Sequence, residues 1–369
     1  MSESSDSRRL SEIRREIDSI DEQLQVLINE RARLAQEVGQ TKYPQPVGLS
    51  SKPRDYYRPE REAEILRAAV ARNAGPLKEE VIVRLFREIM SACLSQQEPL
   101  KVAFLGPAGT FSQAAVLKQF GHSVRTLAAP SIEEVFHDVA AGIADFGVVP
   151  VENSTEGTVS TTLDMLVTTP LSISGEVELR IRQHLLARVD SLAAVQRVYS
   201  HQQSLAQCRA WLEQRLPGVE QVAVASNAEA ARLAAEEVGA AAIAGDTAAE
   251  IYSLQVLMPN IEDRPDNTTR FVVIGHETPG PSGRDKTSLL LSSRHAAGAL
   301  QELLYPLSKH EVSMTRIESR PSRRGKWDYV FFVDVEGHRE DANVAAALRD
   351  LEKAAAWCRV LGSYPAAIL

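Results

Sequence analysis

Residues 101–120, KVAFLGPAGTFSQAAVLKQF, join an apolar strand-like run, a turn rich in glycine and proline, and an amphipathic helix. Further short apolar runs occur at residues 146–151, 195–200, 222–226, 240–245 and 270–275. They alternate with segments of helical spacing at residues 131–141, 204–216 and 227–237. This alternation is typical of an α/β domain with a mainly parallel sheet. We predict such a domain over residues 99–280, large enough for two lobes with a cleft between them.

The chain before this domain is predicted to be entirely helical. Apolar residues recur at intervals of three, four and seven from Ile13 to Val38 with no intervening proline, which predicts a helix of about 30 residues. A helix of that length cannot cover its own apolar stripe, so a second copy of the chain is expected to cover it. Two more helices are expected, from Pro59 and over 78–97, after a loop at 42–57. Residues 1–98 form this domain.

The chain after residue 276 has a different pattern. A Pro-, Gly- and Ser-rich segment at 277–286 is predicted to be a linker. Strand and helix patterns then follow in the order βαββαβ, which is typical of the ferredoxin-like α+β arrangement. The third predicted domain covers residues 281–369, so the chain is multidomain.

The composition excludes several classes of protein. Hydrophobic residues make up 44% and charged residues 24% of 369 positions, as in soluble globular proteins. The net charge of −8 argues against nucleic acid as the main partner. Neither a secretory signal nor the ~18-residue apolar run of a membrane helix is present. Cys93, Cys208 and Cys358 are too scattered for a disulfide framework or a metal site, so a reducing cytoplasm is expected.

Four polar residues interrupt the apolar stripes of the predicted helices: Arg14, Arg31, Glu62 and Gln97. A charge on a core-facing stripe is costly unless it is paired or bound to a ligand. Arg31 alone would be explained by exposure at the helix edge or by a structural ion pair with Glu62. Four such residues together favour a polar pocket for a small dianion.

Three segments of this region resemble the all-helical chorismate mutase family: 13–42, RPEREAEIL at 58–66 and VIVRLFREIMSACLSQQ at 81–97. The resemblance implies a helical bundle, an intertwined dimer and conversion of chorismate to prephenate. It also implies that Arg14 of the partner subunit and Arg31 hold the carboxylates. Lys42 and Gln97 would donate to the ether oxygen. The remaining implied substrate-binding residues are Glu62, Arg58, Arg61 and Cys93, although some relatives have Asp in place of Arg58 and Ser in place of Cys93.

Polar side chains cluster at the ends of predicted strands in the central domain. Seven Ser, Thr or Asn residues lie within VPVENSTEGTVSTTLDML at 149–166, and further polar groups occur in YSHQQSLAQC at 199–208 and DNTTRFVVIG at 266–275. Ligands of open α/β sheets bind beyond the carboxyl ends of strands. The turn at 106–109 lacks the signatures of nucleotide-binding loops. His201 is either a general base or, more often for a lone loop histidine, a structural residue.

The segments GPAGTFS, VPVENSTEGTV, YSHQQSLAQC and NTTRF occur in the order found in prephenate dehydratases, which this region resembles over 101–276. The resemblance implies two lobes like those of periplasmic binding proteins and the conversion of prephenate to phenylpyruvate without a metal or organic cofactor. It implies catalytic roles for Thr269, Asn153 and Gln203. Thr110, Ser112 and Ser154 would bind the substrate.

The last segment resembles the ACT domain that follows prephenate dehydratases, in TSLLLSS at 287–293, ESRP at 318–321 and VLGSYP at 360–365. The resemblance implies pairing of two such domains edge to edge with phenylalanine at their interface. The implied phenylalanine-binding residues are Gly298, Ala299, Leu300, Glu318, Ser319, Arg320 and Pro321. A solvated strand end is the simpler interpretation of 318–320.

Together these resemblances predict a cytoplasmic bifunctional enzyme of L-phenylalanine synthesis, at least dimeric and inhibited by phenylalanine. Three alternatives stay open: a regulatory protein built from an inactive enzyme, a dehydratase that prefers arogenate, and a helical dimerisation arm without mutase activity.

Overall fold

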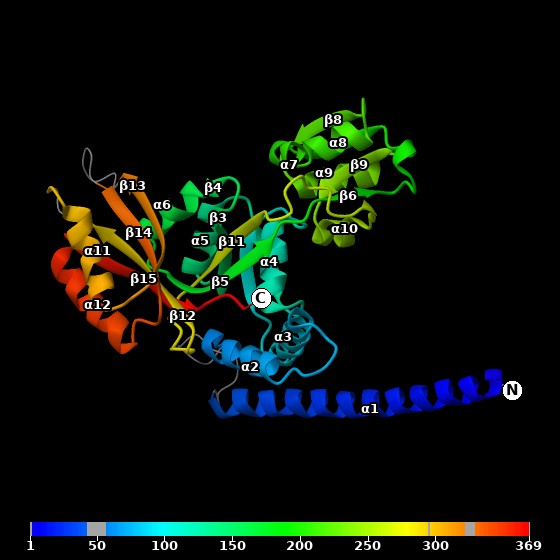
Figure 1. Cartoon of the computed structure of the whole chain (residues 1–369), viewed down its shortest axis with the longest axis horizontal. Coiled ribbons are helices and arrows are strands. Elements are labelled where there is room, and N and C mark those ends of the chain that lie inside the picture. Colours follow the sequence, from blue (N-terminus) through cyan, green and yellow to red (C-terminus); the bar gives the residue numbers. More distant parts are fainter. Residues whose placement is uncertain (1, 43–56, 294–295, 322–328, 369) are drawn as a thin grey trace.

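The structure, a computed structural model, describes residues 2–42, 57–293, 296–321 and 329–368 (Figure 1). Within them the chain forms a helical N-terminal part, a two-lobed α/β part and a C-terminal α+β part. These classes confirm the predicted fold. None of the described helices combines the length and apolar character needed to cross a membrane.

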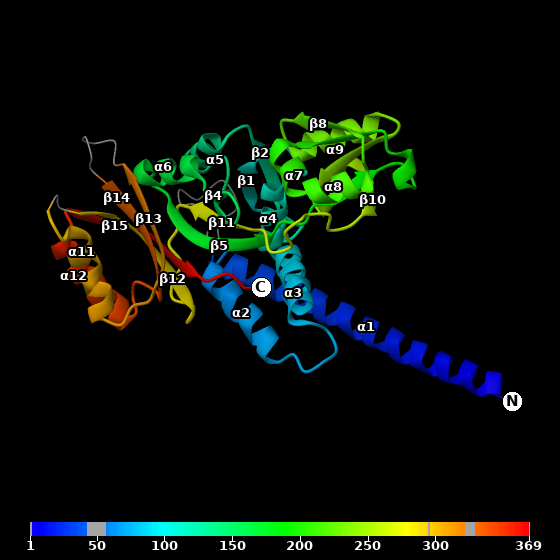
Figure 2. The ribbon, with the colours of Figure 1, turned by 45° about the horizontal axis from the view of Figure 1, so that its top comes forward.

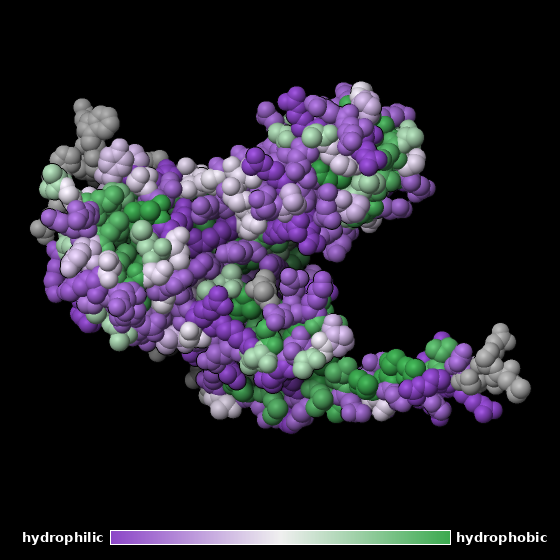
Figure 3. All heavy atoms as spheres, viewed as in Figure 1, coloured by the Kyte–Doolittle hydropathy of each residue, from purple (hydrophilic) through white to green (hydrophobic). Residues whose placement is uncertain are grey.

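The N-terminal part consists of three helices, α1 (Ser2–Lys42), α2 (Pro59–Ala71) and α3 (Glu79–Ser95). The α1 helix extends away from the rest of the chain as an arm (Figures 1 and 2). Its apolar stripe is uncovered, with Ile17 and Leu24 each 50% exposed and Leu27 64% exposed. Apolar residues are visible along this arm in Figure 3. The three helices of one chain therefore do not close a bundle around α1.

The first lobe is built on a sheet of order β2-β1-β3-β11-β5, with β4 paired to β3. Its strands are β1 (Lys101–Leu105), β2 (Arg125–Ala129), β3 (Phe146–Asn153), β4 (Gly157–Thr158), β5 (Ser172–Arg180) and β11 (Thr268–Gly275). The helix α4 (Phe111–Phe120) packs on one face of the sheet. The other face is covered by α5 (Ile132–Ala140) and α6 (Ser160–Thr168).

The second lobe has a sheet of order β10-β6-β9-β7-β8. Its strands are β6 (His184–Ala187), β7 (Arg197–His201), β8 (Glu220–Val224), β9 (Ala240–Ala244) and β10 (Gln255–Met258). Its helices are η1 (Leu192–Ala194), α7 (Gln202–Gln207), α8 (Arg209–Arg215), α9 (Asn227–Glu236) and α10 (Asp246–Tyr252). The chain enters this lobe after β5 and leaves it before β11, and the two crossings are joined by the Ile181 N–H to Asn267 carbonyl hydrogen bond.

Both sheets are mixed, so the prediction of a mainly parallel sheet is wrong. In the first lobe β1 pairs in parallel with β2 and β3, but β11 runs antiparallel to β3 and β5. In the second lobe β6 runs antiparallel to β9 and β10. In the first lobe the reason is the return of the chain: β11 re-enters from the second lobe, and so it runs opposite to its neighbours β3 and β5.

The C-terminal part has the predicted βαββαβ order. It consists of β12 (Asp285–Ser292), α11 (Ala299–Lys309), β13 (Met314–Pro321), β14 (Tyr329–Glu336), α12 (Ala342–Ala354) and β15 (Trp357–Pro365). The sheet order is β13-β14-β12-β15, and all three described pairings are antiparallel. This is the ferredoxin-like topology, with β13 and β15 at the two edges.

The C-terminal sheet packs directly on the first lobe, so the two domains are joined by a shared core as well as by the linker. One apolar core contains Ile173, Val272 and Ile274 of the first lobe together with Leu290, Phe332 and Leu361 of the C-terminal sheet. The linker is also fixed, because Arg67 of α2 donates to the Ser282 and Arg284 carbonyls, both at 2.7 Å. The view in Figure 2 shows this sheet against β5.

The closest approach between these two sheets occurs at Gly362 on β15. A Cβ atom added there would lie 2.0 Å from the carbonyl oxygen of Ile173 on β5 and 2.9 Å from its amide nitrogen. Gly362→Ala is therefore expected to force the two sheets apart and to lower the free energy of unfolding by about 1–3 kcal/mol or more, as overpacking does.

Thermal unfolding measures this effect, and Gly75→Ala is the control because the nearest atom to its Cβ is 3.8 Å away. Equal unfolding temperatures for Gly362→Ala and the wild-type chain would contradict the tight approach of the sheets.

Candidate active sites

A cleft of about 730 Å³ lies between the two α/β lobes. Five predicted site residues line it, together with backbone and side chains from both lobes: Thr110, Ser112, Asn153, Gln203 and Thr269. The first two lie at the start of α4, and Gln203 lies in the first turn of α7. The structure thus brings together residues that are up to 159 positions apart in the sequence.

Thr269 and Asn153 form the centre of the polar wall. They face each other as register partners on β11 and β3, and the Asn153 amide donates to the Thr269 hydroxyl at 2.8 Å. The same amide nitrogen donates to Asn267 Oδ1 at 2.9 Å. Asn153 Oδ1 accepts from the N–H groups of Thr155 and Glu156, which fixes the amide orientation. Because the Thr269 oxygen already accepts a hydrogen bond, its own proton is free to be donated into the cleft.

The opposite wall is held by a buried network in the second lobe. Gln183 donates to Ser204 at 3.0 Å, and the Asn227 Oδ1 accepts from the hydroxyls of Ser200 and Ser204. Gln183 and Ser204 are 1% and 4% exposed. This network rigidifies the wall that carries Gln203.

His201 is placed as a capping residue. It precedes α7, and its Nδ1 accepts a hydrogen bond from the Gln203 N–H at 3.4 Å. It also lines the cleft. The capping contact supports the structural interpretation of this histidine.

The glycine-rich turn at 106–109 joins the two lobes instead of enclosing a phosphate. Gly109 has φ of +90°, and a Cβ there would meet Tyr252 and Ala248 of α10 at 3.2 and 3.3 Å. The Tyr252 hydroxyl donates to the Ala108 carbonyl at 3.3 Å. The turn therefore sets how closely the second lobe approaches the first.

The helical part is fastened to the first lobe by a buried ion pair. Arg87 of α3 lies 3.2 Å from Glu62 of α2, and it also donates to the Lys118 carbonyl of α4 at 2.8 Å. The two side chains are 8% and 13% exposed. Burial raises the pKa of the Glu62 carboxyl, although the Arg87 guanidinium acts in the opposite direction. Glu62 thus faces the first lobe, and its recorded ionic partner is Arg87 instead of Arg31.

A hollow lies at the start of α11 in the C-terminal part. It is lined by Ser293 and residues 296–301. Gly298 precedes the helix with φ of +79°, a left-handed conformation that glycine adopts without strain. Three of the predicted phenylalanine-binding residues, Gly298, Ala299 and Leu300, therefore border one hollow.

Family models match three successive segments of the chain: chorismate mutase type II over 13–98, prephenate dehydratase over 102–279 and the ACT domain over 287–353. The bifunctional chorismate mutase/prephenate dehydratase of Pseudomonas aeruginosa is 52% identical over 99% of this chain and 100% of its own length. The chain belongs to the bifunctional chorismate mutase/prephenate dehydratase family.

Solved structures match the dehydratase and ACT regions. The prephenate dehydratase of Arthrobacter aurescens in complex with L-Phe is 34% identical, with a TM-score of 0.66, over 72% of this chain and 90% of its own. GqqA, described as a novel type of quorum quenching acylase, is 31% identical, with a TM-score of 0.67, over 72% of this chain and 98% of its own.

Membership of this family confirms the predicted activity. The chain is an isomerase and a lyase: it rearranges chorismate to prephenate, and it converts prephenate to phenylpyruvate in the synthesis of L-phenylalanine. The ACT domain is the expected regulatory unit.

The mutase candidates lie in different surroundings within the single chain. Gln97 donates to the Ala35 carbonyl on α1 at 2.8 Å, and Arg31 lies one turn before Ala35 on the same side of the helix. Arg14 lies in the exposed N-terminal half of α1. Among the other candidates, Lys42 ends α1, Arg58 and Arg61 make ion pairs with nearby glutamates, and Cys93 is buried on α3.

Two predicted dehydratase and ACT assignments fall outside the pockets described above. Ser154 is exposed and does not line the cleft, and its hydroxyl accepts from the Thr268 N–H at 3.0 Å. The ESRP segment, Glu318–Pro321, lies on the edge strand β13 and does not line the α11 hollow. Its Arg320 lies 3.0 Å from Asp164 of α6 in the dehydratase domain.

Several polar cleft residues were not predicted from the sequence, among them Gln183, Asn227 and Asn267. Asn267 directly precedes the TTRF motif, so its position was a usable signal. Gln183 and Asn227 lie outside the segments that resemble the dehydratase motifs, and only the packing of the second lobe shows that they reach the cleft.

Proposed function

We propose that prephenate is dehydrated in the cleft between the lobes and that Thr269 donates the hydrogen bond to the departing hydroxyl. The observation that carries this proposal is the 2.8 Å contact in which Asn153 donates to the Thr269 oxygen. This contact uses the Thr269 oxygen as an acceptor and so leaves its proton available for donation to a ligand. Preorganised donors of this kind stabilise charge that develops in the transition state.

The reaction needs a hydrogen-bond donor at only one point. Prephenate loses its ring carboxylate as CO2 while the C4 hydroxyl leaves and, with one proton taken up, becomes water. The ring becomes aromatic, which drives the reaction, and the barrier lies in the departure of the hydroxyl. Thr269 donates to that oxygen and Asn153 holds Thr269. Gln203 reaches the cleft from the opposite wall, where it is placed to bind or polarise the substrate.

The carboxylates of prephenate have suitable partners in the same cleft. Thr110 and Ser112 lie at the N-terminus of α4, where free N–H groups and the helix dipole favour an anion. Ser226, which caps α9, lines the facing wall. We assign Thr110 and Ser112 to one carboxylate, and Ser154 to support of the loop that carries Asn153.

For the mutase reaction we propose a site completed by a second copy of the chain. The uncovered apolar stripe of α1 supports this, because it leaves large side chains such as Leu24 and Leu27 half-exposed or more. Arg14 of the partner subunit, with Arg31, Lys42 and Gln97, would then surround chorismate, beside Arg58, Arg61, Glu62 and Cys93. The minimal assembly is a dimer. Its free thiols Cys93, Cys208 and Cys358 suit a reducing cytoplasm.

The function as a whole is tested by incubating purified protein with chorismate and following prephenate and phenylpyruvate. We expect both products in sequence. Supply of prephenate or arogenate separately then identifies the preferred dehydratase substrate. Absence of any turnover would favour a regulatory protein, and phenylpyruvate only from supplied prephenate would favour a helical arm without mutase activity.

We further propose that phenylalanine binds at the ACT domain and inhibits the dehydratase. The complex of the related Arthrobacter aurescens enzyme with L-Phe supports this, as does the hollow beside Gly298. The ESRP strand would complete the site where two ACT domains meet at the β13 edge.

Gly298→Val is expected to abolish inhibition of the dehydratase by phenylalanine while its uninhibited rate stays near that of the wild type. A branched side chain fills the hollow and strains the left-handed backbone at this position. Dehydratase rate against phenylalanine concentration measures the effect. Gly142→Val is the control, because it also has φ of +72° and open space around it. Unchanged inhibition in Gly298→Val would place the effector site elsewhere.

A further inference from the structure

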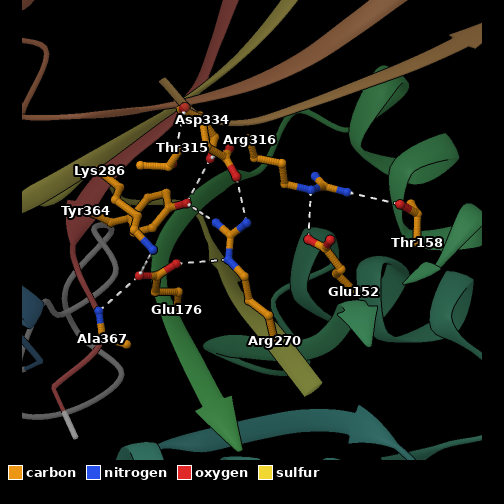
Figure 4. Close-up of polar contacts among 11 residues, drawn as sticks. Glu152, Thr158, Glu176, Arg270, Lys286, Thr315, Arg316, Asp334, Tyr364 and Ala367 are labelled. Atoms are coloured by element: carbon orange, nitrogen blue, oxygen red, sulfur yellow. Dashed lines mark hydrogen bonds and ion pairs between the residues drawn. The ribbon is translucent and has the colours of Figure 1, made fainter. Parts of the chain in front are cut away.

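The ACT domain contacts the dehydratase sheet at the residues next to Thr269 and Asn153, which are called the catalytic pair below. Arg270 follows Thr269 on β11, Glu152 precedes Asn153 on β3, and these two neighbours are themselves register partners. Side chains alternate along a strand, so Arg270 points away from the cleft that Thr269 and Phe271 line. Figure 4 shows both Arg270 and Glu152 among side chains of the ACT sheet.

Arg270 is the centre of a buried polar cluster shared by two domains. Its guanidinium lies 2.9 Å from Glu176 of β5, 2.6 Å from Asp334 of β14 and 3.1 Å from the Tyr364 hydroxyl of β15. The Glu176 and Asp334 side chains are 0% and 7% exposed. Lys286 neutralises the second oxygen of Glu176 at 2.7 Å. The cluster thus balances two carboxylates with two cations.

The hydrogen bonds of this cluster form a closed ring. Arg270 donates to Tyr364 and to Asp334, and Ser288 donates to the other oxygen of Asp334 at 2.6 Å. Ser288 and Tyr364 are 2.8 Å apart, so the Tyr364 proton is left for Ser288. A fully satisfied buried network fixes its members, because any displacement leaves a desolvated charge unpaired.

A second contact holds the other catalytic strand. Arg316 of β13 lies 2.8 Å from Glu152 and donates to Thr158 of β4 at 3.3 Å. Arg316 is therefore tied to the strand end from which Asn153 reaches Thr269. The same β13 strand carries the ESRP segment.

The pairing of β11 with β3 is irregular next to Arg270 and Glu152, the two residues that contact the ACT domain. The register of β11 on β3 shifts between Arg270 and Phe271, whose partners are Glu152 and Pro150. The extra residue, Val151, is a β-bulge, and bulges interrupt the ladder and redirect side chains. The bulge on β3 thus separates Asn153 and Thr269 from the regular part of the β3–β11 pairing. Arg270 and Glu152, which contact the ACT domain, lie between the bulge and this catalytic pair.

We propose that Arg270 is a positioning residue for the dehydratase reaction, and that the ACT domain controls the geometry of Thr269 through the Arg270–Asp334 contact. This inference rests on the proposed role of Thr269. A ligand that shifts the ACT sheet pulls on Arg270 and Glu152 together, and so it changes the Thr269–Asn153 alignment without entering the cleft. A displacement of about 1 Å at a reacting group is enough to reduce a rate by about a hundredfold.

The test compares Asp334→Asn, Arg270→Lys and Arg270→Met in the full-length chain, with prephenate as substrate. Asp334→Asn keeps the shape and removes one charge, and Arg270→Lys keeps the charge and loses the fork of donors. We expect kcat to fall by about tenfold in these two variants and by about a hundredfold in Arg270→Met, with KM within twofold of the wild type. The mutase rate reports the integrity of each variant.

Arg359→Met is the matched control. Arg359 of β15 also joins the ACT domain to the dehydratase, by donating to the carbonyls of Thr169 and Leu166, but it lies away from the catalytic strands. We expect its kcat to stay near that of the wild type. An equal loss of kcat in Arg359→Met and Asp334→Asn would overturn the proposal in favour of general anchoring.

A double-variant cycle separates this inference from the proposed role of Thr269. If Arg270 acts through the Thr269 hydroxyl, the fold-loss of kcat in the double variant Thr269→Ser/Arg270→Lys is smaller than the product of the fold-losses in the two single variants. A fold-loss in the double variant equal to that product would overturn the positioning role. Wild-type kcat in Asp334→Asn and Arg270→Lys, when Thr269→Ala is inactive, would overturn it as well. Full activity of Thr269→Ala would instead overturn the proposed function itself.

Discussion

Thr269→Ala is expected to lower the dehydratase rate by about a hundredfold to a thousandfold, the usual loss when one transition-state donor is removed. The mutase rate of the same variant is expected to stay unchanged, so prephenate accumulates from chorismate. The reason is local: Thr269 is 8% exposed, it lines the cleft, and its oxygen is held in one position by Asn153, so the alanine variant lacks the oriented donor. Rates of prephenate and phenylpyruvate formation from chorismate measure both outcomes.

Two further variants make this prediction specific. Thr269→Ser keeps the hydroxyl and is expected to retain part of the activity. Thr268→Ala removes the adjacent hydroxyl, which donates to the Asp266 carbonyl at 3.3 Å, and is expected to be near normal. If Thr269→Ala and Thr269→Ser are both active to the same extent, Thr269 has only a structural role.

Arg31→Ala is expected to nearly abolish chorismate turnover and to leave dehydration of supplied prephenate intact. Removal of one partner from a buried hydrogen-bonded charge pair costs about 2–5 kcal/mol, which is roughly thirtyfold to several thousandfold in rate. Arg31 is half-buried on the side of α1 that meets Gln97, which is where a carboxylate clamp for chorismate is proposed.

Arg33→Ala is the matched control for this variant. Arg33 lies two residues further along α1, is exposed, and pairs with Glu30 and Glu37 on its own helix. Its loss removes the same guanidinium without touching the proposed site. Equal mutase rates in Arg31→Ala and the wild type, with the dimer intact by sedimentation, would contradict the proposed pocket.

Local patterns in the sequence were sufficient for the domain classes and for five of the residues that line the cleft. The strand of Thr269 and the polar run after β3 were visible because strand ends and motif residues are adjacent in sequence. The strands β2, β4, β5, β6 and β10 were missed, because none of them is a longer apolar run with clear turn signals on both sides. The mixed direction of the sheets depends on where β11 returns, and a long-range path of this kind leaves no periodicity in the sequence.

Glu62 illustrates a second limit of the sequence. Its spacing on the apolar stripe of α2 indicated a buried position, which the structure has, but spacing does not show which domain the stripe meets. The stripe of α2 and α3 is shared between α1 and the dehydratase domain, and Arg87, an unremarked residue of α3, is the recorded ionic partner of Glu62.

Val272 and Ile274 share an apolar core with Leu290 and Phe332 of the ACT domain. This core limits how the enzyme can be made insensitive to phenylalanine. Deletion of residues 281–369 would bare one face of the dehydratase sheet and leave the buried Glu176 and Arg270 without Lys286, Asp334 and Tyr364. Such a fragment would be prone to aggregation before its regulation could be assessed. For overproduction of phenylalanine, single substitutions in the α11 hollow therefore offer a sounder route than truncation, because they alter effector binding and keep the shared core closed.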